Sequence, residues 1–121
     1  MKDEITFDDF QKLDIRIGTI VKAEVPEWSH WVMKLTVDFD KEIGERTIFA
    51  GIMKHYKPEE VEGRQAPFIV NLKAKKMGSE GDLSQGMMLM ASIFDKSGDP
   101  EGEEPIFLNV DKKVPNGTKV T

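Results

Sequence analysis

Hydrophobic and polar residues alternate along two long stretches of the chain, which is the pattern of strands that bury one face. In residues 13–25 the odd-numbered positions are mostly apolar, including Val21, and most even-numbered ones are polar. Gly18 interrupts this stretch, which indicates a bulge, a bend or a close backbone approach. In residues 31–39 the same parity places Trp31 with the core residues. Both stretches are predicted to be strands.

Three further strands and two helices are predicted from the remaining pattern. After a turn at 40–44, strands are expected at 45–52, 67–72 and 86–94, with helices at 6–12 and 56–63. A glycine-bearing loop is expected to join the fourth and fifth strands. Five strands with a helix between the third and fourth predict an all-β, five-stranded OB-fold barrel with a short N-terminal helix.

Residues 104–121 exceed what a five-stranded barrel needs, so they predict a C-terminal extension. It contains a possible strand at 105–110 and a Pro115-Asn116-Gly117 turn. An apolar extension of this kind covers a barrel edge or pairs with another copy of the chain. We expect one domain at 8–121, preceded by an N-terminal segment at 1–7.

Composition agrees with one globular domain, because 121 residues with 39% hydrophobic and 32% charged side chains can bury a single core. The chain has no cysteine, and its apolar runs are too short to cross a bilayer. We therefore expect a soluble, cytoplasmic protein with no membrane partner. The net charge of -5 argues against indiscriminate binding to polyanions, although a local basic patch remains compatible with it.

No pattern of an enzyme is present. The two histidines, His30 and His55, have no partners at metal-ligand spacing, and no phosphate loop, dinucleotide fingerprint or nucleophile motif occurs. We predict no catalytic residue, no metal and no cofactor, and therefore a binding protein.

A basic cluster gives the clearest indication of a ligand. Lys73, Lys75 and Lys76 follow the fourth strand, and the corner Ser84-Gln85-Gly86-Met87 opens the fifth. Lysines bind phosphates, and hydroxyl and amide groups can bind base or ribose edges. The alternative is a solvated lysine face beside an ordinary strand start.

Arg16, Trp28 and Trp31 are further candidates. The Arg16 side chain either binds a phosphate or base, or forms a salt bridge with Asp14 or another acid. Trp28 lies in the predicted loop at 26–30 and is free to stack on a ligand or to be partly buried.

The chain resembles the tRNA-binding domain family, which includes stand-alone dimers, C-terminal appendages of methionyl-tRNA synthetase and CsaA-type export chaperones. The motifs that carry the resemblance run in order through almost the whole sequence. They are Asp9-Phe10-Gln11-Lys12-Leu13-Asp14-Ile15-Arg16-Ile17-Gly18, Tyr56-Lys57-Pro58-Glu59-Glu60, Asn71-Leu72-Lys73, Ser84-Gln85-Gly86-Met87 and Pro115-Asn116-Gly117-Thr118.

This resemblance implies an OB-fold that binds tRNA through its folded shape, without catalysis, as a homodimer formed by the added segments. Together with the residue patterns, it gives an expected RNA-binding set of Arg16, Asn71, Lys73, Lys75, Lys76, Ser84, Gln85, Gly86 and Met87. The expected dimer contacts are Phe7, Phe10, Ile106, Phe107, Leu108 and Val110.

Two functions follow. The first is tRNA binding by a homodimer that would assist an aminoacyl-tRNA synthetase, such as methionyl-tRNA synthetase, in trans. The second is a CsaA-type chaperone for unfolded or preprotein peptides, with Trp28, Trp31 and Met87 lining an apolar groove. Residues 25–35 look more like the chaperone branch, whereas the Asn-Leu-Lys and Ser-Gln-Gly-Met motifs look more like the synthetase appendages.

Overall fold

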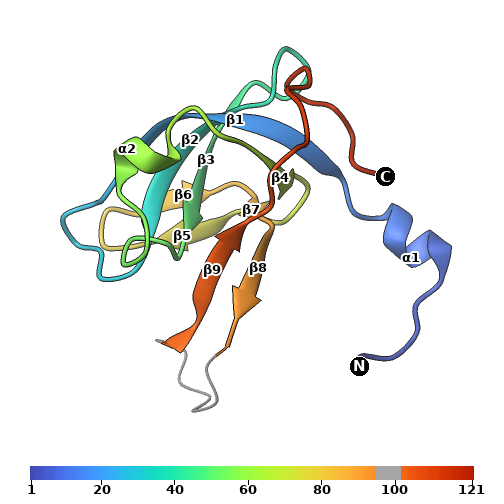
Figure 1. Cartoon of the computed structure of the whole chain (residues 1–121), viewed down its shortest axis with the longest axis horizontal. Helices are drawn as coiled ribbons and strands as arrows, with labels where there is room; N and C mark the ends of the chain where they lie inside the picture. The colour runs from blue at the N-terminus through green and yellow to red at the C-terminus, as the bar shows by residue number, and fades with distance from the viewer. Residues whose placement is uncertain (95–101) are drawn as a thin grey trace.

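A computed structural model describes residues 1–94 and 102–121 of the chain. Its body is an antiparallel sheet with strand order β3-β2-β1-β4-β7, which curls into a nearly closed barrel (Figure 1). The predicted all-β, five-stranded OB-fold is therefore confirmed. The strands of the barrel are β1 (Ile15–Glu24), β2 (Met33–Asp38), β3 (Glu45–Ala50), β4 (Gln65–Ile69) and β7 (Met87–Met88).

Both predicted helices are present. Helix α1 (Phe7–Gln11) begins after Thr6, whose hydroxyl accepts a hydrogen bond from the Asp9 N–H while the Asp9 carboxylate accepts one from the Thr6 N–H. This reciprocal cap satisfies two backbone donors at the helix start. Helix α2 (Pro58–Val61) connects β3 to β4 and buries Val61. By contrast, α1 buries none of its residues and projects away from the barrel (Figure 1).

A bulge in β1 interrupts the alternation that the sequence predicted. The register with β2 shifts between Ile20 and Lys22, so that Ile20 pairs with Val37 and Ala23 pairs with Leu35. Ile20 is completely buried, whereas Val21 is 45% exposed, so the placement of Val21 on the apolar side is wrong. The extra residue at the bulge changes the core-facing parity from even-numbered Ile20 to odd-numbered Ala23, which is buried as predicted.

Gly18 provides a close approach. A Cβ atom at this position would lie 2.6 Å from side-chain atoms of both Phe39 and Val37. The space that the missing side chain leaves lets Phe39 reach Phe68, and the two rings meet edge to face with centroids 5.4 Å apart. Gly18 therefore sets the packing of the core rather than the bend of the strand.

The region between β4 and the C-terminal extension differs from the prediction. The expected loop contains a hairpin, β5 (Lys75–Met77) and β6 (Asp82–Ser84). The expected fifth strand is divided into β7, which pairs with β4, and β8 (Met90–Ile93), which pairs with β9 (Glu104–Phe107) in a ribbon that leaves the barrel (Figure 1). The apolar run could not reveal this division, because both halves are equally hydrophobic.

The C-terminal residues return to the first half of β1. The Ile17 N–H donates to the Thr118 carbonyl and the Val120 N–H donates to the Ile15 carbonyl, both at 2.9 Å. The predicted turn is present, because the Thr118 N–H donates to the Pro115 carbonyl at 3.2 Å. The extension therefore covers the part of the β1 edge that is not paired with β2. Covering a barrel edge was one of the two roles predicted for the extension.

Candidate nucleic-acid interface

Ser84 and Gln85 close the barrel. Gln85 donates its N–H to the Thr47 carbonyl at 2.8 Å and accepts the Thr47 N–H through its side-chain oxygen at 3.1 Å. The Ser84 hydroxyl oxygen accepts the Phe49 N–H at 3.1 Å. These bonds pair the edge of β3 that faces away from β2, so the two side chains that were expected to contact RNA are used within the fold.

Gly86 lets the closing segment approach β4. Its φ is +151°, and a Cβ atom there would lie 2.7 Å from the Ile69 carbonyl oxygen. The next two side chains point in opposite directions: Met88 is buried, whereas Met87 is 53% exposed. Gly86 and Met87 were both predicted to bind RNA; Gly86 has a structural role, and Met87 is available at the surface.

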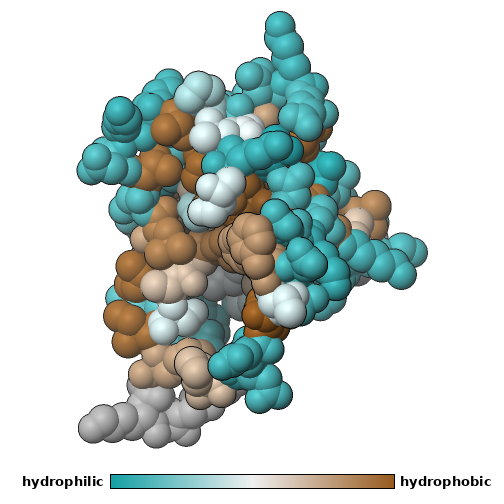
Figure 2. Space-filling view, turned by 90° about the vertical axis from the view of Figure 1, so that its right-hand side faces the viewer, coloured by the Kyte–Doolittle hydropathy of each residue, from teal (hydrophilic) through white to brown (hydrophobic). Residues whose placement is uncertain are grey.

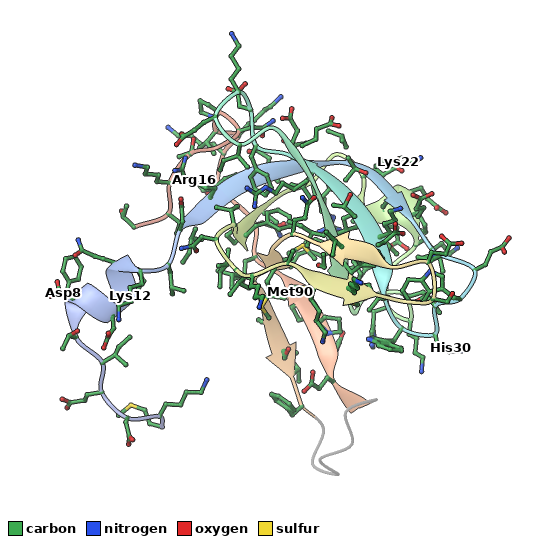
Figure 3. All side chains as sticks on the ribbon, turned by 180° about the vertical axis from the view of Figure 1, so that it is seen from behind. Asp8, Lys12, Arg16, Lys22, His30 and Met90 are labelled. Carbon is green, nitrogen blue, oxygen red and sulfur yellow. The ribbon has the colours of Figure 1, made fainter. Side chains whose placement is uncertain are left out.

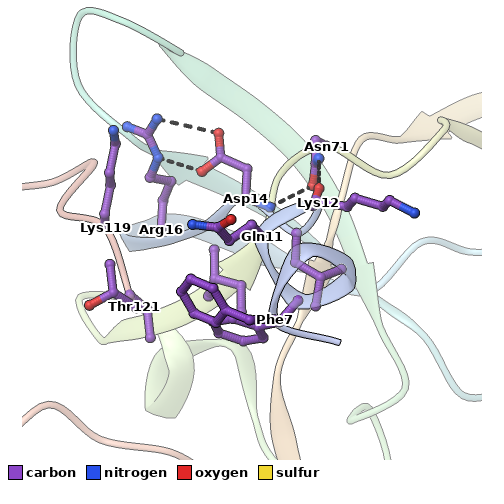
Figure 4. Close-up of a pocket in the computed structure, with 12 residues that line it drawn as sticks. Phe7, Gln11, Lys12, Asp14, Arg16, Asn71, Lys119 and Thr121 are labelled. Carbon is purple, nitrogen blue, oxygen red and sulfur yellow. Dashed lines mark hydrogen bonds and ion pairs between the residues drawn. The ribbon is translucent and has the colours of Figure 1, made fainter. Parts of the chain in front are cut away.

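Asn71 ties the start of the lysine-bearing segment to the N-terminal arm. Its side-chain oxygen accepts the Asp14 N–H at 2.8 Å, and its amide nitrogen donates to the Lys12 carbonyl at 2.7 Å (Figure 4). Both ends of the amide are therefore occupied by backbone groups. The Asn71 side chain fixes the exit of α1 instead of being free for a ligand.

Arg16 is a buried structural residue. Its side chain is 7% exposed, and it donates to Asp14 through two nitrogens at 2.6 and 3.3 Å and to Glu42 at 3.2 Å. A further bond to the Gly117 carbonyl, at 3.2 Å, holds the C-terminal turn. The hydrogen bonds to Asp14 and then to Glu42 raise the Arg16 pKa above its ordinary range. The geometry supports the salt-bridge alternative, and the Arg16 guanidinium is not presented to a ligand.

The three lysines, in contrast, face the solvent. We call residues 71–84 the lysine loop; it contains the β5–β6 hairpin, and Lys73, Lys75 and Lys76 are all exposed. Within the described parts of the chain none of the three forms an ion pair, and Asp82 of the same loop pairs with Lys34 at 3.2 Å. The positive charge of the loop therefore remains available for an anionic ligand.

Of the two tryptophans, Trp28 is partly buried, which is one of the two alternatives that the sequence left open, whereas Trp31 differs from its prediction. Trp28 packs on Phe49, with ring centroids 5.9 Å apart, and Gly78 of the lysine loop lies directly against its indole. Trp31 is 56% exposed, so its placement in the core is wrong. The strand begins only at Met33, and a turn in which Ser29 bonds to Val32 precedes it, so the parity does not extend back to Trp31.

Trp31 borders a surface hollow at the end of the barrel remote from Arg16, near His30 (Figure 3). A second hollow, which Met87 and Met90 line, shares Gly51 and Pro105 with the first. Two of the three residues expected to bind peptides, Trp31 and Met87, thus flank neighbouring hollows. The third, Trp28, does not.

Arg46 was not recognised in the sequence. It pairs with Val37 in the register of β3 with β2, on the parity of the buried residue Ile48. Its guanidinium donates to the carbonyls of Val70, at 2.7 Å, and Gln85, at 3.3 Å, on either side of the lysine loop. The available signal was a charged side chain at a core-facing position of a strand.

The described residues contain neither a cluster of three acidic or histidine side chains that could hold a metal ion nor a helix long and apolar enough to cross a membrane.

With this geometry in place, comparison with known proteins decides the family. Residues 15–119 match the family described as "Putative tRNA binding domain". The chain belongs to the tRNA-binding domain family. Among curated proteins, it is 36% identical over 119 residues to the methionine–tRNA ligase of Clostridium tetani and 43% identical over 120 residues to that of Archaeoglobus fulgidus. Each match includes 98% of this chain but only 17% and 16% of the respective ligase.

Two solved structures are similar to this tRNA-binding domain over their whole length. The MetRS-related protein of Pyrococcus horikoshii is 36% identical with a TM-score of 0.82, and the match covers 99% of this chain and 100% of that one. The chaperone CsaA of Bacillus anthracis is 32% identical with a TM-score of 0.79, covering 98% and 100%. The domain is therefore related both to ligase-associated and to chaperone proteins, as the sequence motifs indicated.

Proposed function

We propose that this domain binds tRNA through the lysine loop, without catalysing a reaction. The observation that carries the proposal is the exposure of Lys73, Lys75 and Lys76 without ion-pair partners in the described residues, in a protein of net charge -5. Neutralisation of phosphates by lysine supplies most of the affinity of a protein for nucleic acid. The match to the tRNA-binding family supports tRNA as the ligand.

The same geometry favours recognition of the RNA backbone and shape over its sequence. Asn71, Ser84 and Gln85 use side-chain oxygens to hold the fold, which leaves these side chains fewer groups for base edges. Trp28, the ring nearest the loop, packs between Phe49 and Gly78 and does not offer an open stacking face. Contacts to phosphates position a protein on RNA but carry no sequence information.

We also propose that the domain forms a homodimer through α1 and the ribbon of β8 and β9. Phe7 is 70% exposed and Phe10 is 37% exposed, on a five-residue helix too short to be stable without packing. Figure 2 looks onto the side from which α1 projects and shows hydrophobic side chains gathered on it. Leu108 is 41% exposed, and Ile106 and Val110 are partly buried.

Phe107 was among the predicted dimer contacts but is not part of the proposed interface. It is only 6% exposed, its ring meets that of Tyr56 edge to face with centroids 4.9 Å apart, and the Arg64 guanidinium lies 4.4 Å from its centroid. It anchors the ribbon to the barrel.

A dimer would place two lysine loops on one particle, which raises the effective affinity for one RNA without new contacts.

The physiological partner that we propose is a methionyl-tRNA synthetase in the cytoplasm. Two relatives are methionine–tRNA ligases, and a third is a MetRS-related protein. In this role the domain supplies affinity for tRNA and the ligase supplies catalysis, in trans if the two are separate chains.

A peptide-binding chaperone is the second candidate. The observation that favours it is the exposure of Trp31 and Met87 beside the two neighbouring hollows. Methionine side chains adapt to varied apolar ligands. This activity would use apolar contacts and would depend only weakly on salt, in contrast to binding at the lysines.

The experiment is a titration with total tRNA at two salt concentrations, with an unfolded peptide pool in parallel. The double variant Lys73→Glu with Lys76→Glu is expected to abolish tRNA binding. The matched control is Lys112→Glu with Lys113→Glu, two exposed lysines outside the loop, which should retain it. Binding that is unchanged in the first variant would refute the site, and Trp31→Ala that weakens peptide binding alone would favour the chaperone function.

A further inference from the structure

Arg46 occupies a position from which one side chain reaches both ends of the lysine loop. A single guanidinium nitrogen donates to the Val70 carbonyl at 2.7 Å and to the Gln85 carbonyl at 3.3 Å. Val70 precedes the loop and Gln85 follows it. Hydrogen bonds from a charged donor are shorter and stronger than neutral ones, so this nitrogen fixes the separation of the two ends.

The anchor at the two ends adds to a short pairing within the loop. That pairing is three residues on each side, between β5 and β6, and a two-stranded ribbon of that size is marginal on its own. The middle of the loop is supported by the packing of Gly78 on Trp28 and by the ion pair of Asp82 with Lys34. At the ends, Val70 donates its N–H to the Asp14 carbonyl at 2.9 Å, and Gln85 is bonded to Thr47. Arg46 is the residue that connects one end directly to the other.

We propose that Arg46 is a positioning residue for RNA binding, which holds both ends of the lysine loop and so presents Lys73, Lys75 and Lys76 in a fixed arrangement. This inference rests on the proposed function. Fixing the loop in the free protein lowers the entropy that binding must overcome, so the same three charges bind more tightly. Lysine at position 46 would replace the planar fork by a mobile point charge and would hold the ends less well.

A double-mutant cycle with tRNA separates positioning from direct contact. Lys73→Ala with Lys76→Ala is expected to weaken binding about tenfold in the native background, but less than about threefold when Arg46→Met is also present. The smaller effect is expected because Arg46→Met by itself has already removed most of the tRNA affinity that the two lysines contribute. Additive losses would show that Arg46 contacts the RNA independently and would overturn the inference.

Hydrogen exchange of the free protein gives a readout that does not depend on RNA binding. Arg46→Met should accelerate amide exchange in β5 and β6 by about tenfold or more, while exchange in β1 and β2 stays within about threefold of the native protein. Unchanged amide exchange in β5 and β6 of Arg46→Met would overturn the inference even if the native protein binds tRNA. Accelerated exchange would support the anchoring role of Arg46 even if the native protein does not bind tRNA. If Arg46→Met does not fold, Arg46→Lys is used in both measurements, with the same direction of change expected.

Discussion

The two kinds of residue within the lysine loop and its flanks have opposite fates. The polar and glycine positions, Asn71, Ser84, Gln85 and Gly86, are bound to or packed against backbone of the domain itself. The lysines between them are exposed and form no ion pair within the described residues. The polar and glycine positions and Lys73 belong to the motifs that carry the family resemblance, yet of these residues Lys73 is the one whose charged group lies free at the surface.

This difference shows that a family motif can combine the requirements of the fold with those of binding. The edge of β3 that faces away from β2 is closed by Ser84 and Gln85, and Asn71 at the other end of the loop holds the N-terminal arm. A substitution at those positions should therefore reduce stability first. A substitution at the lysines should reduce affinity alone, and the following variants test that division.

The largest expected effect is on stability, from Gly86→Ala. The backbone here has φ of +151°, and the added Cβ would lie 2.7 Å from the Ile69 carbonyl oxygen. We expect the free energy of unfolding to fall by about 2 to 4 kcal/mol, because the strained conformation and the contact are both unfavourable. Urea denaturation measures it. A variant as stable as the native protein would show that β7 can move away from β4 without cost.

Gln85→Ala should have a smaller effect of the same kind. It leaves the Thr47 N–H without the partner that now lies 3.1 Å away, at a partly buried site. We expect a loss of about 1 to 3 kcal/mol in the free energy of unfolding, as for other unsatisfied donors. Lys76→Ala is the matched comparison and should change stability by less than about 0.5 kcal/mol. If Lys76→Ala proved the more destabilising of the two, the division between the two kinds of residue would be wrong.

Asn71→Ala should release the N-terminal arm. The substitution removes the bonds to the Asp14 N–H and the Lys12 carbonyl, both of which are exposed to solvent in part, so a loss of about 1 kcal/mol is expected. Amide exchange at residues 12–14 should become faster, while tRNA affinity should fall less than in Lys73→Ala. A loss of affinity greater than that of Lys73→Ala would indicate that the amide contacts RNA after all.

The smallest effect concerns pH and α1. The hydrogen bond from Lys12, followed by that from the Thr6 backbone, lowers the pKa of Asp9. Because the folded pKa lies below the unfolded one, the ionised carboxylate stabilises the helix above about pH 4 and the stabilisation is lost as the pH falls through the folded pKa. Chemical shifts of residues 7–11 should then move towards coil values in acid, and in Asp9→Ala that movement should be absent. If the native protein and Asp9→Ala gave identical titrations, the cap would be excluded as the cause of the chemical-shift change.

Local alternation and turn chemistry predicted most of the barrel strands and both helices, because strand and helix patterns depend on neighbours in the sequence. The arrangement of the strands in an OB-fold was supported by the resemblance to the family, because strand pairing joins distant residues. Two errors had a common cause. The bulge at Val21 and the turn before Met33 each break a strict period of two, and neither has a distinctive residue to reveal it. Trp31 and Val21 were therefore assigned to the wrong side, although the strands themselves were recognised.

The candidate site was predictable only in part, for a different reason. The lysines could be identified because charge clusters are local. The engagement of Asn71 with Lys12, and of Gln85 with Thr47, joins segments 59 and 38 residues apart, which no local pattern reports. Arg46 was missed for the same reason, since its partners lie 24 and 39 residues away.

The most direct test of the central claim measures tRNA affinity against salt, together with stability, for Lys73→Ala combined with Lys75→Ala and Lys76→Ala. We expect weaker binding, a plot of log affinity against log salt flatter by about two units, and a free energy of unfolding within about 0.5 kcal/mol of the native value. The Lys112→Ala and Lys113→Ala control should leave both the affinity and the slope unchanged. An unaltered affinity and slope in the triple variant would contradict the account, because the lysine loop would then be a solvated surface and not the site of tRNA binding.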